Sequence, residues 1–454
     1  MPGARPELAR DLGVSHAGAI VVGTIIGSGI FLVPAEMMQA VGSAKLVYLA
    51  WLVGGLLSFF GALTYAELGA MKPQAGGEYV YVRDGYGPLA GFLYAWTTLL
   101  ISKPASIATI TTGLVRILGT FPVFAFFSHP ILTRPVAIGY GQLVAIAATI
   151  LISLLNYLGV KKAGEFQLIF TVLKVAIIVG IVGIGFSYSE GSWGHFAGHY
   201  SAAQGGILGF MTALVAALWA YDGWNDLNMV GGEIRQPERN IPLALIVGVA
   251  TVGALYMLVN AALQYVLPVH AIAASPRPAS DAIGLVWGAL GAGIVSAGMA
   301  LSMLVTLNGS TMSGARVTFA VARDGYFFSA LGKVHPRFHT PHVALVVQGF
   351  LAIVLLLLGG SFRQFFSLAI FAEWLFYMIT ASTVFVFRRR DPELARPYRV
   401  WGYPVVPALF VMASGYLLYR IFTDNLFYSS FGCLIILAGI PAFYRFARKR
   451  RLSA

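Results

Sequence analysis

Residues suited to binding a small charged molecule gather in the stretch Gly23-Thr-Ile-Ile-Gly-Ser-Gly-Ile-Phe31. This stretch lies in the middle of an apolar run, about residues 14–39, that is long enough to cross a membrane. Two glycines around a serine at that depth predict an interrupted helix, which persists in lipid only where it lines a cavity. A new helix beginning at Ser28, Gly29 and Ile30 would direct N–H groups and its positive dipole end into that cavity. We therefore expect a carboxylate site here, the alternative being a glycine face that only packs helices together.

A second interruption is predicted in the sixth apolar run, at Leu218-Trp-Ala-Tyr-Asp-Gly-Trp-Asn225. The carbonyl ends of the two preceding half-helices, at Ile25 and at Trp219 and Ala220, would offer unpaired oxygens to a cation or an ammonium group. A carboxylate and an ammonium group on neighbouring atoms describe an α-amino acid. The two interruptions together therefore predict an amino acid as the ligand.

Three charged residues lie deep in apolar runs. A charge at the bilayer centre costs at least ~2.5–3.5 kcal/mol, so Lys174 is expected to face the protein interior, where it argues against sodium coupling but leaves proton coupling open. Glu373 is expected to line the pathway, to carry a proton or to neutralise a base such as Lys103, unless it is a permanently paired buried acid. Asp222 either satisfies the broken backbone or faces the substrate side chain, where it would favour small polar or cationic substrates.

The composition is that of a polytopic membrane protein. The chain has 454 residues, of which 58% are hydrophobic and 11% are charged. The net charge is +12, and the positive residues gather in alternate loops. This distribution indicates the topology of the chain in the membrane and does not indicate nucleic-acid binding. The single cysteine, Cys433, excludes an internal disulfide, and we expect no metal site, no cofactor and no catalytic residues.

Twelve apolar segments set the expected architecture, an all-α protein with both termini in the cytoplasm, as an even number of spans requires. The expected segments cover residues 14–39, 45–70, 87–118, 136–158, 165–187, 206–232, 241–267, 282–315, 342–360, 363–387, 404–421 and 426–446.

The two predicted breaks fall in the first and sixth segments, five apart. Because five is odd, two five-span units would lie in the membrane with opposite orientation, which is typical of transporters with inverted repeats. The expected organisation is a cytoplasmic tail, two repeats, two peripheral spans and a basic tail, over residues 1–13, 14–187, 206–387, 404–446 and 447–454.

These residues resemble the motifs of the amino acid–polyamine–organocation (APC) superfamily. Within it, the chain is most similar to the L-type amino acid transporter family and its bacterial alanine/serine/threonine exchanger relatives. The resemblance runs along nearly the whole chain and rests on Gly23–Phe31, Lys103-Pro104, Tyr221–Asn225, Gly232-Glu233-Ile234, Pro237 to Pro242, Asn308-Gly309-Ser310, Arg316, Ala322–Gly325 and Asp391–Tyr398.

The resemblance implies a five-plus-five inverted-repeat core with discontinuous helices 1 and 6 and two peripheral helices. It implies that the substrate carboxylate lies on the Gly27-Ser28-Gly29 backbone, with the amino group on the carbonyls of Ile25 and Trp219 and with Trp219 as a gate. Asn225 would tune the site or link span six to its neighbours, and Lys174 would bridge the broken part of span one to spans five and eight. The predicted substrate site consists of Ile25, Ile26, Gly27, Ser28, Gly29, Ile30, Trp219, Ala220, Tyr221, Asp222, Gly223 and Asn225, with Lys174, Glu373 and Lys103 as coupling residues.

The function expected from these patterns is sodium-independent exchange of small neutral amino acids, such as alanine, serine and threonine, across the inner membrane of a bacterium. Animal members of the family carry a cysteine between spans three and four that bonds an accessory heavy chain, and this chain has none there, so no such partner is expected. Membrane lipid is the other expected partner, and no nucleic acid is expected. The alternatives are a proton-coupled symporter and an amino acid-sensing receptor that does not transport; an enzyme is not expected.

Overall fold

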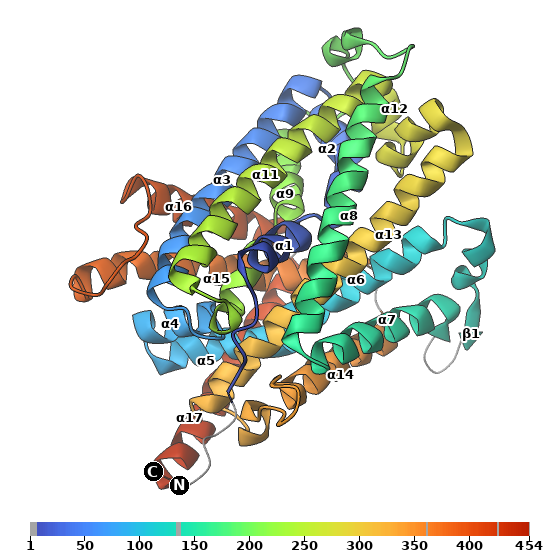
Figure 1. The fold of residues 1–454 in the computed structure, drawn as a ribbon. Helices are drawn as coiled ribbons and strands as arrows, with labels where there is room; N and C mark the ends of the chain where they lie inside the picture. Colours follow the sequence, from blue (N-terminus) through green and yellow to red (C-terminus); the bar gives the residue numbers. More distant parts are fainter. Residues whose placement is uncertain (1–6, 133–137, 360–361, 425, 454) are drawn as a thin grey trace.

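The computed structural model describes residues 7–132, 138–359, 362–424 and 426–453, and it is built almost entirely of helices (Figure 1). The first group of helices is α1 (Val14–Ile25), α2 (Gly29–Val41), α3 (Ala44–Met71), α4 (Glu78–Tyr86), α5 (Pro88–Thr97), the π-helical turn η1 (Thr98–Ser102) and α6 (Lys103–Leu118). The second is α7 (Tyr140–Tyr157), α8 (Val160–Phe186), α9 (Gly206–Ala220), α10 (Asp226–Met229), α11 (Pro237–Val266), α12 (Val269–Ala274) and α13 (Pro278–Arg323). The third is α14 (His342–Leu358), α15 (Phe362–Arg390), α16 (Val405–Asp424) and α17 (Leu426–Ser453).

Shorter elements join these helices. The 3₁₀ turns are η2 (Pro122–Ser128), η3 (Trp193–Ala197), η4 (Gly231–Glu233) and η5 (Ser329–Gly332). Strands β1 (Pro130–Leu132) and β2 (Ile138–Gly139) form a two-stranded antiparallel ribbon in which Pro130 lies opposite Gly139.

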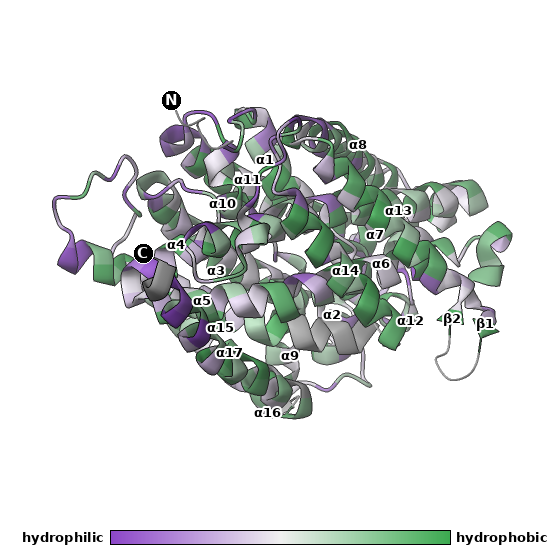
Figure 2. Cartoon of the chain, turned by 90° about the horizontal axis from the view of Figure 1, so that it is seen from below, coloured by the Kyte–Doolittle hydropathy of each residue, from purple (hydrophilic) through white to green (hydrophobic). Residues whose placement is uncertain are grey.

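Ten helical stretches in the described part of the chain are long and apolar enough to cross a membrane, and α9 and α14 are shorter apolar helices. Each of the twelve segments expected from the sequence overlaps one of these stretches or short helices within the described residues. Much of the ribbon of these helices has the colour of hydrophobic residues in Figure 2. The chain is therefore a multi-pass membrane protein, as its composition predicts.

Helix α1 lies inside the bundle, in contact with α8, α11 and α13, while α2 packs against α9 (Figure 1). Its glycines permit this close packing. A Cβ atom at Gly23 would lie 2.3 Å from the Thr171 hydroxyl on α8, and in the partner helix α13 a Cβ at Gly309 would lie 2.4 Å from the Thr24 hydroxyl. The helix that carries the first interruption is thus held on two sides by polar residues.

Two of the residues that carry the family resemblance form a buried ion pair. Arg316 on α13 donates from Nε to Glu233 on η4 at 2.7 Å, and both side chains are inaccessible to solvent. This pair ties the segment that follows the second interruption to α13.

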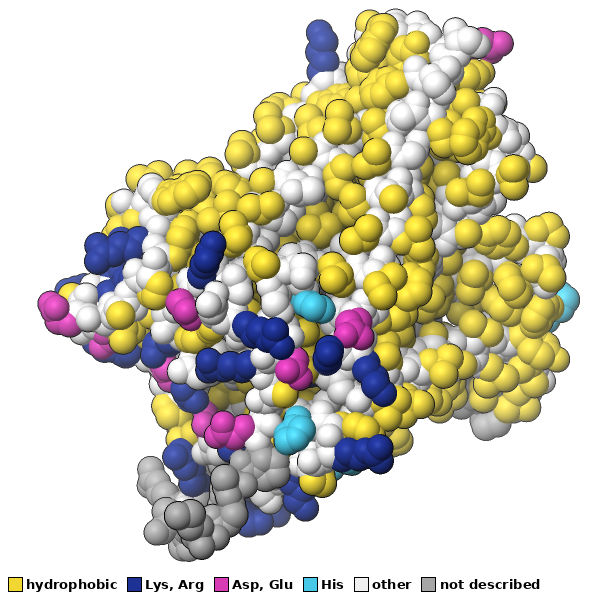
Figure 3. All heavy atoms as spheres, in the orientation of Figure 1, with side chains coloured by type: hydrophobic (Ala, Val, Ile, Leu, Met, Phe, Trp, Pro, Cys, Tyr) yellow, Lys and Arg dark blue, Asp and Glu magenta, His cyan; other side chains and the backbone are white. Residues whose placement is uncertain are grey.

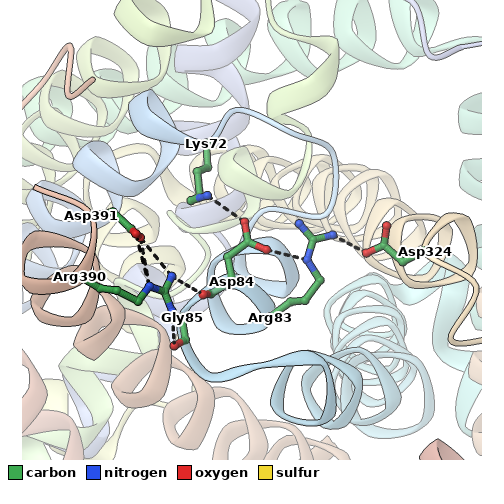
Figure 4. A network of polar contacts seen from close by, with 7 residues as sticks. All are labelled: Lys72, Arg83, Asp84, Gly85, Asp324, Arg390 and Asp391. Atoms are coloured by element: carbon green, nitrogen blue, oxygen red, sulfur yellow. Dashed lines mark hydrogen bonds and ion pairs between the residues drawn. The ribbon is translucent and has the colours of Figure 1, made fainter. Parts of the chain in front are cut away.

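The first and last described residues lie at the same end of the molecule, and Lys and Arg side chains gather there on the face drawn in Figure 3. Figure 4 shows a network at this end that connects α4 to the ends of α3, α13 and α15. Asp84 accepts hydrogen bonds from Lys72 at 2.8 Å and from Arg83 at 2.7 Å, and Arg83 also donates a hydrogen bond to Asp324. Burial alone would raise the pKa of Asp84, but the hydrogen bonds from Arg83 and Lys72 outweigh it and hold that pKa below its ordinary value.

Candidate functional site

The two predicted interruptions are present and lie against each other. Helix α1 ends at Ile25 and α2 begins at Gly29, while α9 ends at Ala220 and α10 begins at Asp226. A Cβ atom at Gly29 would lie 2.9 Å from the Cα of Ala220, so the two broken helices approach to a distance that only glycine allows.

Gly223 provides a second close contact between the interruptions. Its φ of 106° lies in the left-handed region, and a Cβ atom there would lie 2.9 Å from Thr24 Cγ2. The turn between α9 and α10 therefore depends on glycine for its backbone conformation as well as for space.

The start of α2 faces a cavity. The empty volume of this cavity, including its mouth, is about 810 Å³, and its walls come from both interruptions and from α6, α13 and α15. No described residue accepts a hydrogen bond from the backbone N–H groups of Ser28, Gly29 or Ile30. Because α2 has 13 residues and its dipole adds to these N–H groups, its start suits a carboxylate.

The carbonyl ends of the preceding half-helices are not bare, which corrects the expectation from the sequence. The hydroxyl of Tyr256 on α11 bridges the carbonyl oxygens of Ile25, at 3.2 Å, and Ala220, at 2.9 Å. The carbonyl of Trp219 accepts from the N–H of Asp222 at 3.1 Å. The Ile25 carbonyl also accepts from the N–H of Gly27 at 2.8 Å, and the Trp219 carbonyl also accepts from the N–H of Tyr221. A carbonyl oxygen has two lone pairs, so among these three the Ala220 carbonyl, with one donor among the described residues, retains an acceptor position for an ammonium group.

Lys174 lies behind the first interruption and is buried. From α8, its Nζ donates to the carbonyls of Gly23 and Ile26, both at 2.7 Å, and to Ser302 on α13 at 3.3 Å. The hydroxyl of Ser302 also donates to Ile26 at 2.7 Å. The lysine thus connects the broken segment to α8 and α13, the contacts that the family resemblance implies.

The lining of the cavity is rich in acids. Asp222, Asp226 and Glu373 line it together with a single cation, Lys103. Lys103 on α6 donates to Asp226 at 2.5 Å, so among the described residues its ion pair is with this acid, while Glu373 lies within range of its charge.

A chain of hydrogen bonds continues from this wall. The Tyr377 hydroxyl lies 2.9 Å from Asp222 Oδ1 and 3.0 Å from Asn225 Oδ1. Asn225 donates to Glu78 at 3.0 Å, which links α4 to the second interruption.

Nine of the twelve residues predicted to bind substrate line the cavity: Ile25, Gly27, Ser28, Gly29, Trp219, Ala220, Asp222, Gly223 and Asn225. Ile26, Ile30 and Tyr221 are buried elsewhere and are not among its lining residues. The Ile26 carbonyl is engaged by Lys174, and the Tyr221 ring packs against Trp51 and Tyr256. Of the predicted coupling residues, Lys103 and Glu373 line the cavity and Lys174 lies on the far side of the break.

Sequence reasoning missed Asp226, Glu78, Tyr256 and Tyr377. Asp226 follows Asn225 directly, so a third deep acid in the same motif was a visible signal. The two tyrosines act through hydroxyl groups on otherwise apolar helices, and nothing in their local sequence distinguishes them from core aromatics.

The family model for amino acid permeases matches residues 12–440. The chain belongs to the amino acid permease family. It is 32% identical over 451 residues to the serine/threonine exchanger SteT of Bacillus subtilis (strain 168), covering 98% of both chains. It is 32% identical to the b(0,+)-type amino acid transporter 1 of Homo sapiens, over 97% of this chain and 88% of the relative. It is 31% identical to the cystine/glutamate transporter of Homo sapiens, over 97% of this chain and 86% of the relative.

These similarities confirm the L-type transporter relationship inferred from the motifs. The relatives are transporters and not enzymes. The match covers residues 12–440. Both interruptions and the cavity between them therefore lie in the part of the chain that the family shares.

Proposed function

We propose that this permease is a sodium-independent exchanger of small neutral amino acids that works by alternating access. The observation that carries the proposal is the cavity between the two interruptions. Ser28 and Gly29 line it with N–H groups that have no acceptor among the described residues, and Ala220 lines it with a carbonyl that retains an acceptor position. This arrangement matches the carboxylate and ammonium groups that all α-amino acids share.

Lys174 supports sodium independence. Its ammonium group fills the space behind the break and already uses the carbonyls of Gly23 and Ile26, the kind of oxygen ligand that a sodium ion would need. A fixed positive charge at this position also repels a second cation.

The proposed substrate size rests on the walls of the cavity. Trp219 lies beside the start of α2, and a Cβ atom at Gly29 would lie 3.7 Å from its ring. The serine/threonine exchange named for the Bacillus subtilis relative fits a small polar side chain in the remaining space. Trp219 is proposed to close over the bound substrate.

The proposed topology has twelve spans, both termini in the cytoplasm and inverted repeats over residues 14–187 and 206–387. Its support is the placement of the two interruptions, five segments apart, and the shared end of the described termini. The proposed location is the plasma membrane, with the two peripheral spans over residues 404–446 and without a disulfide-linked heavy chain.

The test is uptake of radiolabelled L-serine into proteoliposomes of purified protein, without sodium and without a pH gradient. Vesicles loaded with unlabelled L-serine are compared with empty vesicles. Uptake that requires internal amino acid supports exchange. Equal uptake into empty vesicles would overturn exchange, and binding without uptake in either case would indicate a sensor.

Gly29→Val tests the binding site itself. The added side chain would meet Ala220 and cover the N–H groups at the start of α2, so we expect serine binding to be lost while the protein still inserts. Gly180→Val on α8 is the matched control, because a Cβ atom there meets nothing within 4 Å. Unchanged serine affinity in Gly29→Val would remove the first interruption from the mechanism.

A further inference from the structure

An exposed apolar surface lies on the segment that joins α6 to α7, between two predicted spans. It is formed by η2 and β1, and its exposed hydrophobic side chains, from 43% to 71% accessible, are those of Val123, Phe126, Ile131 and Leu132. The sequence between Arg116 and Arg134 contains no Asp, Glu, Lys or Arg. Hydrophobic side chains cover the part of Figure 3 where Figure 1 places β1. An apolar surface of this kind indicates contact with lipid or with another protein.

This surface continues the outward face of α7. That face is formed by exposed side chains at helical spacing, namely Tyr140, Leu143, Ile150, Leu151 and Leu154. Because α7 is long and apolar enough to cross the membrane, its outward face meets lipid.

η2 packs directly on the beginning of this face. The rings of Phe126 and Tyr140 lie 5.6 Å apart, and the N–H of Tyr140 donates to the carbonyl of His129 at 3.2 Å. The apolar surface of η2 and β1 is therefore continuous with a surface that lies in lipid.

The length of α7 gives the depth of this surface. At ~1.5 Å per residue its 18 residues span about 27 Å, slightly less than a hydrocarbon core of ~30 Å. Its last residue, Tyr157, accepts from the hydroxyl of Thr340, and His339 beside it lies 3.3 Å from the carbonyl of Glu7. The end of α7 thus lies with the termini, and its beginning, with η2, falls at the opposite boundary of the bilayer.

The backbone of η2 suits a place with little water. The N–H groups of Phe124 and His129 are bonded within the segment, both at 2.9 Å, and the hydroxyl of Ser128 donates within it at 2.8 Å. Pro122 and Pro130 have no N–H group to satisfy. Since unpaired backbone groups are costly in lipid, these features lower the cost of placing the segment there.

We propose that η2 and β1 form an anchor that lies in the lipid at the bilayer boundary opposite to the termini. The occupant of the surface is phospholipid and not a second protein, because the surface continues a lipid-facing helix and lacks the charged rim typical of a protein interface. The anchor would hold α6, whose Ser106, Thr109 and Ile110 line the cavity, at a fixed depth in the membrane. This inference rests on the multi-pass fold and goes beyond the proposed function.

The experiment is electron paramagnetic resonance on the full-length protein in phospholipid vesicles, with one nitroxide label per chain. The single cysteine is removed by Cys433→Ser, and the label is attached through Val123→Cys or Phe126→Cys. Molecular oxygen concentrates among acyl chains, whereas a nickel chelate stays in water. We expect both labels to be more accessible to oxygen than to the nickel chelate.

Two further positions give the reference values in the same background. Leu151→Cys places the label on the outward face of α7 and marks lipid. Glu393→Cys places it on an exposed residue between α15 and α16 and marks water. The ratio of oxygen to nickel accessibility at Val123 and Phe126 should be close to that at Leu151. Ile131→Cys is a third label position on the same surface should either of the others disturb folding.

A ratio equal to that at Glu393 would place the surface in water and overturn the proposal. Low accessibility to both reagents would overturn it too, because it would mean that a second copy or another protein covers the surface. The measurement does not depend on serine, so failure of the exchange assay contradicts the proposed function and leaves the anchor to be decided by the labels alone.

Discussion

The first interruption lies between two regions that accommodate buried ionisable side chains in different ways. Behind it, the hydrogen bonds of the buried Lys174 side chain all go to the neutral carbonyls of Gly23, Ile26 and Ser302. In front of it, three acids line a cavity with one cation, Lys103. A buried charge is tolerated when fixed dipoles surround it, whereas a group of like charges must bind a counter-charge or a proton.

The comparison indicates which region can change during transport. The Lys174 side has a fixed set of donors and acceptors, so it holds the broken backbone in one shape. The acid side has three carboxyl groups around one cation, so a positively charged group in the cavity would change its balance of charge. The Lys174 side of the broken helix thus fixes the shape of the backbone, and the acid side responds to a bound substrate.

Lys103→Met is expected to produce the largest effect on stability, because it leaves Asp226 buried, 2% exposed, without its cation. Breaking a buried pair from one side costs about 3–5 kcal/mol. We expect thermal unfolding in detergent at a much lower temperature. The double variant Lys103→Met/Asp226→Asn should recover most of the loss, and equal destabilisation of the single and double variants would contradict the pairing.

Lys174→Ala removes the fixed cation and should cost roughly 1.5–3 kcal/mol for its charged hydrogen bonds, since the Ile26 carbonyl keeps its bond from Ser302. We expect exchange to be lost without any gain of sodium dependence, because the broken segment loses its shape. Uptake assays with and without sodium measure both effects. Lys161→Ala, which alters an exposed lysine of the same helix, is the control, and natural exchange rates in Lys174→Ala would contradict a role in transport.

Ser302→Ala removes a weaker interaction on the Lys174 side of the break. It removes a hydroxyl that donates to Ile26 at 2.7 Å, while Lys174 still donates to that carbonyl. We expect a loss of roughly 0.5–1.5 kcal/mol in stability and a modest decrease in exchange. A loss as large as that of Lys174→Ala would mean that the serine, and not the lysine, holds the break.

The smallest effect is expected at Asp84, an acid that lies outside the membrane spans and has its cations beside it. Since the pKa of Asp84 is lowered in the folded protein, its stabilising effect is present above pH ~4 and is lost as the pH falls through the folded value. Thermal unfolding from pH 7 down to 3 should show a decrease below pH ~4 that is smaller in Asp84→Asn. An identical pH profile in both proteins would contradict the contribution of this network.

Local patterns were sufficient to predict the helical segments, the two interruptions and the interior position of Lys174. Hydropathy locates the long apolar helices, and Gly27-Ser28-Gly29 predicts that one of them is interrupted in the middle of the membrane. A lysine at the same depth is expected to face the protein interior because a charge in lipid is costly. Each of these signals is complete within about twenty residues of chain.

The partners of the site could not be predicted in this way. Asn225 and Glu78 are 147 positions apart, and Tyr377 is 155 positions from Asp222. Which of several deep acids pairs with Lys103 depends on how α6, α10 and α15 meet, and hydropathy carries no information about that. The sequence therefore indicated the kind of charges present but assigned Glu373 as the possible partner of Lys103 in place of Asp226.

The Tyr256 hydroxyl has a consequence for how the protein can move. It is bonded to the last carbonyl of α1 and to the last carbonyl of α9, so a rearrangement that separates the two half-helices must break at least one of these bonds. Motions that carry the half-helices together preserve them. The site for the amino acid backbone between the two interruptions would then keep the same dimensions on whichever side of the membrane it opens. An amino acid would therefore bind with similar affinity from either side.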